Sequence, residues 1–429
     1  MTLRAGPDKK RTAPRERMTW GIAETALRLV IVGGAAAVTW VSLGLTAGLT
    51  PGIPLNSPVF GYSTSMAGAN ARQAEQYLQQ YLKKADPRLL SDATSRAARA
   101  LGREPGNVAA ARSLGLVASV KGEANKADRF FAYAETLSRR DQPTELWLIE
   151  RNVAREDVPG ALAHYDRSLR VSRSSRQLLL PVLAKATDDP SIARSLAKII
   201  AGRPNWWSDF MTAILRDGQS TVSLSIIASA LKLDIGDTTD KWWLGGILDR
   251  LVDKQAYHPA FTLYQQATSK AQAASLVRNP LLDRSGTGPF EWTIAADPDL
   301  AGIYQRRPDS GQMALFLTSN AGSGGTVARQ LLMLPAGRYH LTGTGGDVTG
   351  DPATHPIVSL SCAKGMGQDT GLAEIVLPNL PSQGGRFAQS VIVPTEGCTA
   401  QWLTVSLKAR DYAQETIPWL SRLDVQAIR

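Results

Sequence analysis

Hydrophobic and polar residues follow three different patterns along the 429-residue chain. Residues 29–49 (LVIVGGAAAVTWVSLGLTAGL) form an uncharged run, which as a helix spans about 30 Å and matches the hydrocarbon core of a bilayer. Residues 70–282 are rich in alanine, leucine, arginine and glutamine, a composition typical of helices. Residues 283–429 contain short alternating runs separated by glycine and proline turns, which predict strands. The pattern therefore predicts a multidomain α + β chain with an N-terminal transmembrane helix.

The charges beside residues 29–49 predict the orientation of the membrane helix. Residues 1–28 carry seven Lys and Arg against three acidic residues, and such basic flanks stay in the cytoplasm. We therefore expect a basic cytoplasmic leader, a single-pass anchor in the inner (cytoplasmic) membrane, and the bulk of the chain in the periplasm or outside the cell. A cleaved signal peptide ending near Ala47 or Gly48 is the alternative, but the long leader and the long apolar run favour an uncleaved anchor. Prolines within residues 50–69 predict a linker after the helix.

Residues 91–170 repeat a pattern of small and aromatic residues with a constant period. Alanine recurs at equal intervals at Ala93, Ala127 and Ala161, which gives a period of about 34 residues. The same spacing joins Ala97, Phe131 and Tyr165, and also Ala100, Ala134 and Ser168. This small–aromatic–small pattern resembles the tetratricopeptide repeat. The resemblance implies that residues 70–282 form a solenoid of antiparallel helix pairs, in which these side chains pack and whose concave face binds a protein partner of the cell envelope.

Two tryptophan pairs lie in the helical part of the chain, Trp206–Trp207 and Trp242–Trp243. Neighbouring residues on a helix point about 100° apart, so we expect one ring of each pair in the core and the other in a groove or a seam between helices. The rings could serve as platforms for sugars. Packing between helices is the favoured interpretation, because tryptophan buries a large apolar area.

Eight runs in residues 283–429 carry the β-branched or alternating residues typical of strands. Residues 391–393 (VIV) are continuously apolar, and residues 403–407 (LTVSL) alternate with a period of two. No long helical period interrupts the runs, so an antiparallel β-sandwich of jelly-roll type is predicted. The expected strands lie near residues 290–294, 313–318, 327–334, 338–343, 357–361, 387–393, 402–409 and 420–426.

The order of three segments in this β-rich part also carries a resemblance. FEWTI, then QLLMLPAGRYHLTG, then LSRLDVQ resemble the strands of carbohydrate-binding-module-like sandwiches. The resemblance implies glycan binding on exposed aromatic rings, for which Trp292, Tyr412 and Trp419 are the candidates. Trp402 begins a strand and is expected in the core.

Both cysteines of the chain, Cys362 and Cys398, lie in the predicted sandwich. Outside the cytoplasm such a pair can oxidise, so the predicted location favours a disulfide between them. Two unpaired buried thiols are the alternative.

Composition and charge exclude several classes of function. The net charge of +10 is spread over the helical part and the leader, without a recognisable nucleic-acid-binding motif, so no nucleic acid is expected as a partner. The sequence contains no H-E-x-x-H zinc motif, no phosphate-binding P-loop and no G-x-S-x-G elbow. Asp347, Asp351 and His355 share one segment, but their spacing and the nearby prolines favour an exposed loop over a metal site. We therefore predict no cofactor, no metal site and no catalytic residues.

The whole arrangement of leader, anchor, helical repeats and sandwich resembles the membrane-anchored accessory proteins of bacterial exopolysaccharide gene clusters. The resemblance implies a scaffold or adaptor in the assembly or export of surface polysaccharide, which binds a protein through its helices and a polysaccharide through its sandwich. One alternative is a glycan hydrolase or lyase built on the sandwich, since its paired carboxylates would meet only in space. Another is a periplasmic assembly factor for membrane proteins.

Overall fold

The computed structural model describes residues 67–268, 276–364, 369–411 and 416–428. The predicted leader, the predicted membrane helix, nearly all of the predicted linker, and Tyr412 lie outside the described residues. None of the described helices is both long and apolar enough to cross a membrane.

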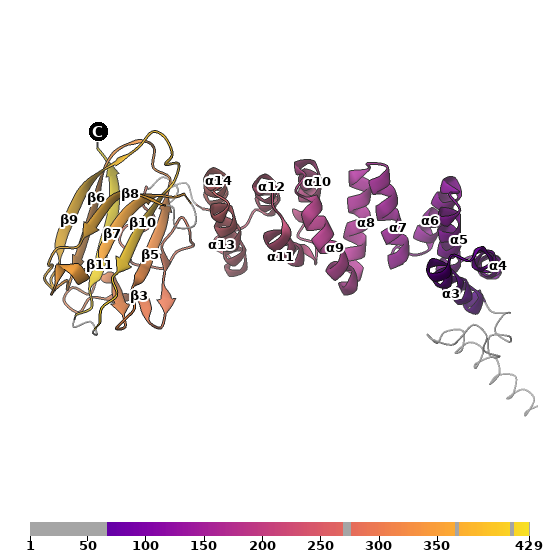
Figure 1. Ribbon diagram of the computed structural model, residues 1–429, viewed down its shortest axis with the longest axis horizontal. Helices are drawn as coiled ribbons and strands as arrows, with labels where there is room; N and C mark the ends of the chain where they lie inside the picture. The colour runs from indigo at the N-terminus through magenta and orange to yellow at the C-terminus, as the bar shows by residue number, and fades with distance from the viewer. Residues whose placement is uncertain (1–66, 269–275, 365–368, 412–415, 429) are drawn as a thin grey trace, which may run out of the picture. The chain divides into compact units, whose positions relative to one another are not determined.

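Twelve helices occupy the first part of the described chain, and they are joined by short turns (Figure 1). Polar side chains cap many of them: Asn107 accepts a hydrogen bond from the Ala110 N–H, and Asp157 accepts one from the Gly160 N–H. The helices are α3 (Ala67–Lys84), α4 (Pro87–Arg103), α5 (Val108–Val120), α6 (Ala124–Leu137), α7 (Gln142–Ala154), α8 (Val158–Val171), α9 (Arg173–Ala186), α10 (Pro190–Ile200), α11 (Trp207–Asp217), α12 (Thr221–Leu231), α13 (Thr238–Asp253) and α14 (Tyr257–Ala267).

The predicted repeat period appears in the spacing of the helices. The first residues of α5 and α7 are separated by the same number of positions as the first residues of α6 and α8. This number is also the separation of Ala93 and Ala127 in the sequence. The predicted packing residues are buried at matching positions of α4, α6 and α8, except that Tyr165 is only half-buried. They are Ala93, Ala127, Phe131, Ala134 and Ala161.

Contacts divide the chain into two units with the boundary between Leu148 and Ile149, inside α7. In the first unit the ring of Phe131 stacks on Trp147, with ring centroids 3.9 Å apart. Gly115 makes room for Phe131, because a Cβ atom at this position would lie 2.8 Å from the ring. The Phe131 ring therefore packs between Gly115 of α5 and Trp147 of α7.

The second unit ends in an antiparallel β-sandwich of two sheets, seen as two layers in Figure 1. The five-stranded sheet has the order β1-β5-β10-β7-β8, and the six-stranded sheet has the order β2-β3-β4-β11-β6-β9. The strands are β1 (Thr293–Ile294), β2 (Ala296–Asp297), β3 (Leu300–Arg306), β4 (Met313–Ser319), β5 (Gly325–Leu332), β6 (Gly337–Gly346), β7 (Ile357–Cys362), β8 (Thr370–Val376), β9 (Gly385–Val393), β10 (Gln401–Leu407) and β11 (Trp419–Ala427).

The sandwich contains three strands that the sequence analysis missed, β2, β3 and β8. β8 is an edge strand, and β3 is followed at the edge only by the short β2. β3 is half-buried to exposed along its whole length, so it carries no regular apolar alternation. β11 contains a bulge, because Leu420 pairs with Gly345 and Arg422 with Thr344, which leaves Ser421 as an extra residue.

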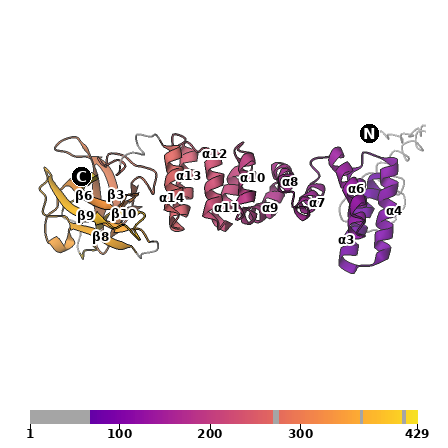
Figure 2. The same ribbon diagram turned by 90° about the horizontal axis from the view of Figure 1, so that it is seen from above.

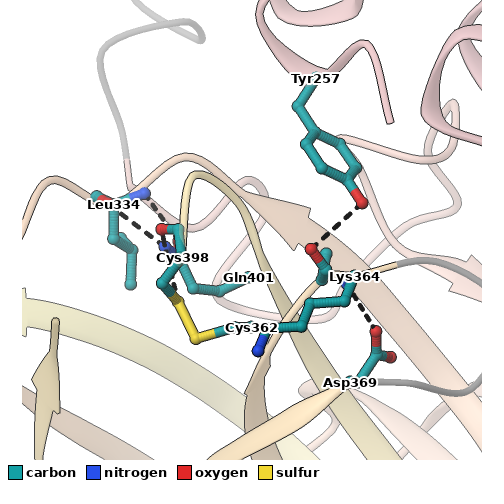
Figure 3. Close-up of a disulfide and its surroundings, with 8 residues drawn as sticks. Tyr257, Leu334, Cys362, Lys364, Asp369, Cys398 and Gln401 are labelled. Carbon is teal, nitrogen blue, oxygen red and sulfur yellow. Dashed lines mark hydrogen bonds between the residues drawn. A yellow bond between two sulfur atoms is a disulfide. The ribbon is translucent and has the colours of Figure 1, made fainter. Parts of the chain in front are cut away.

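A disulfide joins Cys362 and Cys398 with an S–S distance of 2.02 Å (Figure 3). It connects the end of β7 to the turn before β10, and both residues are buried. Gln401 donates a hydrogen bond from its side-chain nitrogen to the Cys398 carbonyl oxygen at 2.8 Å. The predicted pairing of the two cysteines is therefore present.

The helical hairpin of α13 and α14 is attached to the sandwich by polar contacts that are buried or partly buried. The two helices lie side by side in both views (Figure 1 and Figure 2). The Tyr264 hydroxyl donates to Glu291 Oε1 at 2.8 Å, and the backbone N–H of Thr287 donates to Glu291 Oε2 at 2.8 Å. The Tyr257 hydroxyl donates to the Ala363 carbonyl oxygen at 3.2 Å, beside the disulfide (Figure 3).

The segment between α14 and β1 strengthens this junction. The Gln330 side-chain amide exchanges two hydrogen bonds of 2.8 Å with the backbone N–H and carbonyl of Arg278. Val277 and Leu282, which the sequence analysis assigns to the helical part, are buried in the sandwich core. The helical hairpin and the sandwich are thus joined through a shared interior.

Candidate functional site

Trp292 and Trp419, two of the predicted glycan-stacking residues, are buried. Their side chains are 2% and 1% exposed. The indole N–H of Trp292 donates to the Asn279 carbonyl oxygen, and that of Trp419 donates to Asp347 Oδ2, each at 3.1 Å. Neither ring presents a face to solvent, so the structure contradicts the predicted stacking role of both residues.

Three residues distant in the sequence bury the Trp419 ring. The guanidinium of Arg307 lies over its ring at 3.7 Å from the centroid. Gly346 and Gly384 also lie against the Trp419 ring. A Cβ atom would come within 2.3 Å of the ring at Gly346 and within 2.8 Å at Gly384, so only glycine fits at these two positions. Arg307 and the two glycines therefore cover the ring.

The side chains of Asp347, Asp351 and His355 have separate partners. Asp347 accepts from Trp419, and Asp351 caps a short 3-10 helix by accepting from the Ala353 N–H at 2.9 Å. His355 is buried, and its Nδ1 donates to the Leu377 carbonyl oxygen at 2.6 Å.

Trp402 lies on the outer face of the five-stranded sheet and not in the core, where the sequence analysis expects it. Along β10 buried and half-buried residues alternate, and Trp402 and Thr404 belong to the half-buried set. The guanidinium of Arg329, on β5, lies 4.7 Å from the centroid of the Trp402 ring. The alternation of residues 403–407 indicates this orientation. Neighbouring residues of a strand face opposite sides, so Trp402 lies on the outer face when Leu403 lies on the inner face.

Polar side chains extend from Arg329 across the same face. Arg329 pairs with Thr404, Thr404 with Ser359 on β7, and Ser359 with Glu374 on β8. Directly paired residues share a face, so these four side chains form one row across three strand spacings, or about 14 Å. We call Trp402 and this row the sheet platform. It offers a half-exposed indole ring, a guanidinium, two hydroxyls and a carboxylate.

In each tryptophan pair of the helical part, one ring is more deeply buried than the other, as predicted. Trp206 is fully buried and Trp207 half-buried, whereas Trp243 is 7% exposed and Trp242 is 70% exposed. The Trp242 ring meets Trp243 edge to face at 4.7 Å, and Trp243 lies 5.6 Å from Trp207. The exposed ring of Trp242 is therefore backed by the buried ring of Trp243.

A groove of about 600 Å³ lies between α9 and α11. Arg176 is held there by its contacts with the Leu169 carbonyl oxygen at 2.9 Å and Asp209 at 3.0 Å. Pro181 lies inside α9 and has no backbone N–H to donate within the helix. The groove is lined by Arg173, Arg176, Gln177, Leu180, Pro181, Asp209, Thr212, Ala213 and Arg216.

No protein-family model and no curated protein matches this chain. Its β-sandwich resembles solved carbohydrate-binding modules. A family 16 carbohydrate-binding module is 16% identical, with 35% of this chain and 99% of that one covered and a TM-score of 0.26. A CBM4 module is 15% identical, with 36% and 97% covered and a TM-score of 0.26.

The enzymatically active domain of tailspike protein 4 of bacteriophage CBA120 is also similar, at 10% identity and a TM-score of 0.27. The match covers 37% of this chain and 22% of the tailspike chain, so this chain spans about a fifth of that protein's length. At these identities and TM-scores the similarities assign neither a ligand nor a site to this protein.

Proposed function

We propose that this protein is a membrane-anchored scaffold outside the cytoplasm, accessory to the assembly or export of bacterial surface polysaccharide. Its sandwich binds a polysaccharide on the sheet platform, and its tetratricopeptide-like helices bind a protein partner of the cell envelope. It acts by binding and not by catalysis.

The sheet platform supports the glycan-binding part of the proposal. A sugar ring has apolar C–H faces that pack on an indole ring, and hydroxyl groups that both donate and accept hydrogen bonds. Trp402 offers the ring, Arg329 and Glu374 offer a charged donor and a charged acceptor, and Ser359 and Thr404 offer hydroxyls that do both. The four polar side chains lie in one row on strands held in register, and Trp402 lies two residues before Thr404 on β10, so the sheet platform is ordered before a ligand arrives.

The direct test is retention of the intact chain on an array of neutral and acidic oligosaccharides. We expect Trp402→Ala to lower retention about tenfold, because one ring contact contributes about 1.4 kcal/mol. Phe316→Ala is the matched control, since Phe316 is a half-buried aromatic residue of the other sheet. If the array retains no oligosaccharide, or if Trp402→Ala binds as the parent does, the sheet platform is not a glycan site.

The groove between α9 and α11 supports the scaffold part of the proposal. It presents Arg173, Arg176 and Arg216 beside the apolar Leu180 and Pro181, a combination that suits an acidic protein segment with an apolar side chain. Arg173→Glu combined with Arg216→Glu should lower surface polysaccharide in the producing cells while the purified variant still binds the array. Unchanged polysaccharide in those cells would argue against this groove as the partner site.

The uncharged residues 29–49 and their basic flank support the proposed location. Alkaline phosphatase fused to the C-terminus should be active, because that enzyme matures only outside the cytoplasm. A C-terminal reporter that is active only inside the cell would refute the location and with it the proposed role.

Two alternatives can be separated from this proposal by experiment. A hydrolase or lyase built on the sandwich would release new reducing ends or unsaturated sugars from a retained polysaccharide. A periplasmic assembly factor for membrane proteins would change the outer-membrane protein profile when deleted and would leave surface polysaccharide unchanged.

A further inference from the structure

A cavity of about 520 Å³ lies where α13 meets the segment before β1. Trp242, Lys241 and Asp249 line it from the helix, and residues 286–288 line it from the other side. This volume is within the range of ligand pockets, about 300 to 1,000 Å³. An exposed indole ring, a cation and a carboxylate therefore surround one space.

The spacing of residues on α13 builds the helical wall of this cavity. Residues 242, 245, 246 and 249 lie on one face, because positions three, four and seven apart share a helix face. Two of them are glycines, so the helix backbone itself forms the floor between Trp242 and Asp249. A Cβ atom at Gly245 would have its nearest neighbour at 4.0 Å and one at Gly246 at 3.9 Å, so packing of the protein does not require either glycine.

Thr287 provides the opposite wall of the cavity. It lines the cavity and is 6% exposed. Its Oγ1 is buried, and its Cγ2 methyl group is the atom nearest to a Cβ atom built at Gly245, at 4.0 Å. A ligand in the cavity would therefore pack on an apolar methyl group opposite the glycines of α13.

The walls of the cavity are held in place before any ligand binds. Trp242 is backed by Trp243, which is 7% exposed. The loop that carries Thr287 is fixed by its N–H bond to Glu291, which also accepts from Tyr264 on α14. The Trp242 ring and the loop opposite it therefore sit on rigid supports.

The cavity also lies next to the sheet platform. The backbone N–H of Leu331 donates to the carbonyl oxygen of Pro289 at 2.7 Å, and Pro289 directly follows Gly288, which lines the cavity. Leu331 lies opposite Trp402 in the pairing of β5 with β10. One hydrogen bond and one strand pair therefore connect the wall of the cavity to Trp402.

From these contacts we infer that α13 and the sandwich form one bipartite carbohydrate site, in which a glycan chain stacks on Trp402 at one end and on Trp242 at the other. The inference rests on the proposed glycan binding and extends it to the helical part. The helix hairpin is then part of the ligand site, and the buried junction keeps its two halves in register. Only a glycan of several units reaches both rings, so recognition favours long chains over disaccharides.

The test compares variants of the intact chain on the same oligosaccharide array. Trp242→Ala removes the second ring. Gly245→Gln fills the cavity without removing any contact, and it favours the helix because glutamine is a better helix former than glycine. Leu178→Ala is the control, since Leu178 is an exposed apolar residue of another helix, α9.

We expect Trp242→Ala and Gly245→Gln each to lower retention of hexasaccharides about tenfold and that of disaccharides less, with Leu178→Ala unchanged. If Trp402→Ala weakens retention but Trp242→Ala and Gly245→Gln do not, the bipartite site is wrong and the sheet platform alone binds. If only Trp242→Ala has an effect, the ring acts outside the cavity and the inference is also wrong. If the parent chain is retained by no oligosaccharide, the proposed function fails and the inference fails with it.

Discussion

The hydrogen bond between Tyr264 and Glu291 should contribute measurably to the junction of helices and sandwich. Tyr264 is fully buried, and its hydroxyl donates to the carboxylate at 2.8 Å. Burial, with the nearby Glu291 charge, raises the pKa of Tyr264, so the hydroxyl remains a donor at neutral pH. Tyr264→Phe keeps the ring beside Phe261 and Phe290 and removes the hydroxyl, which also interacts with Arg278, so the cycle with Glu291 is needed to isolate the bond to the carboxylate.

The magnitude follows from the charge of the acceptor. A hydrogen bond to a charged group contributes about 1.5–3 kcal/mol, against about 1 kcal/mol for a bond between neutral groups. Tyr264→Phe should therefore lower the free energy of unfolding of the second unit by about 2 kcal/mol. Tyr257→Phe is a matched comparison, because it removes a neutral bond to the Ala363 carbonyl, and it should cost about 1 kcal/mol.

The measurement is urea unfolding followed by tryptophan fluorescence, arranged as a double-mutant cycle with Glu291→Gln. The coupling free energy between the two positions should be about 1.5 kcal/mol or more, because the two groups are in contact. A coupling below about 0.5 kcal/mol is the size expected of independent sites. That result would refute the view that this bond joins the helical hairpin to the sandwich.

Three further changes test other parts of the molecule. Replacing Cys362 and Cys398 by alanine opens a loop of 36 residues, and in the chain-entropy model it lowers the free energy of unfolding by about 3–4 kcal/mol; equal thermal midpoints with and without the disulfide would contradict this. Arg112→Met should cost about 3 kcal/mol in chemical denaturation of the first unit, because it leaves two carboxylates without their shared cation in a largely buried site. Hydrogen bonds from Arg203 lower the pKa of Asp240, so this carboxylate stabilises the fold above about pH 4, and its contribution is lost as the pH falls through the lowered value. Asp240→Asn should remove that part of the acid sensitivity, measured as urea midpoints at pH 7 and pH 3.

The helical repeats could be predicted because their signal is local. Ala127 and Phe131 lie one turn apart on the same helix face, and the pattern recurs with each helix pair. The exposure of Trp242 could have been predicted in the same way, because Trp243, Leu244, Ile247 and Leu248 form the apolar face of α13 and leave Trp242 outside it.

The burial of Trp292 and Trp419 could not be predicted in this way. Trp419 is covered by Arg307, which lies far earlier in the sequence, between β3 and β4. Such contacts depend on which loops the sandwich brings together, and no local pattern records them. Trp402 differs from its expected place for another reason: the size of tryptophan favours the core, but the alternation of its own strand directs the ring to the outer face.

The extra residue at Ser421 limits how the length of β11 can vary. Leu420 lies before the bulge and Leu423 after it, and both are fully buried although an odd number of positions separates them. In a regular strand such a pair would face opposite sides. Deletion of Ser421 would remove the bulge and leave Leu420 and Leu423 two positions apart, so both would still face the space between the sheets. Deletion of Asp424 would instead place Leu423 and Val425 next to each other and turn over one half of the strand. Loss of one residue should therefore be far more damaging at Asp424 than at Ser421.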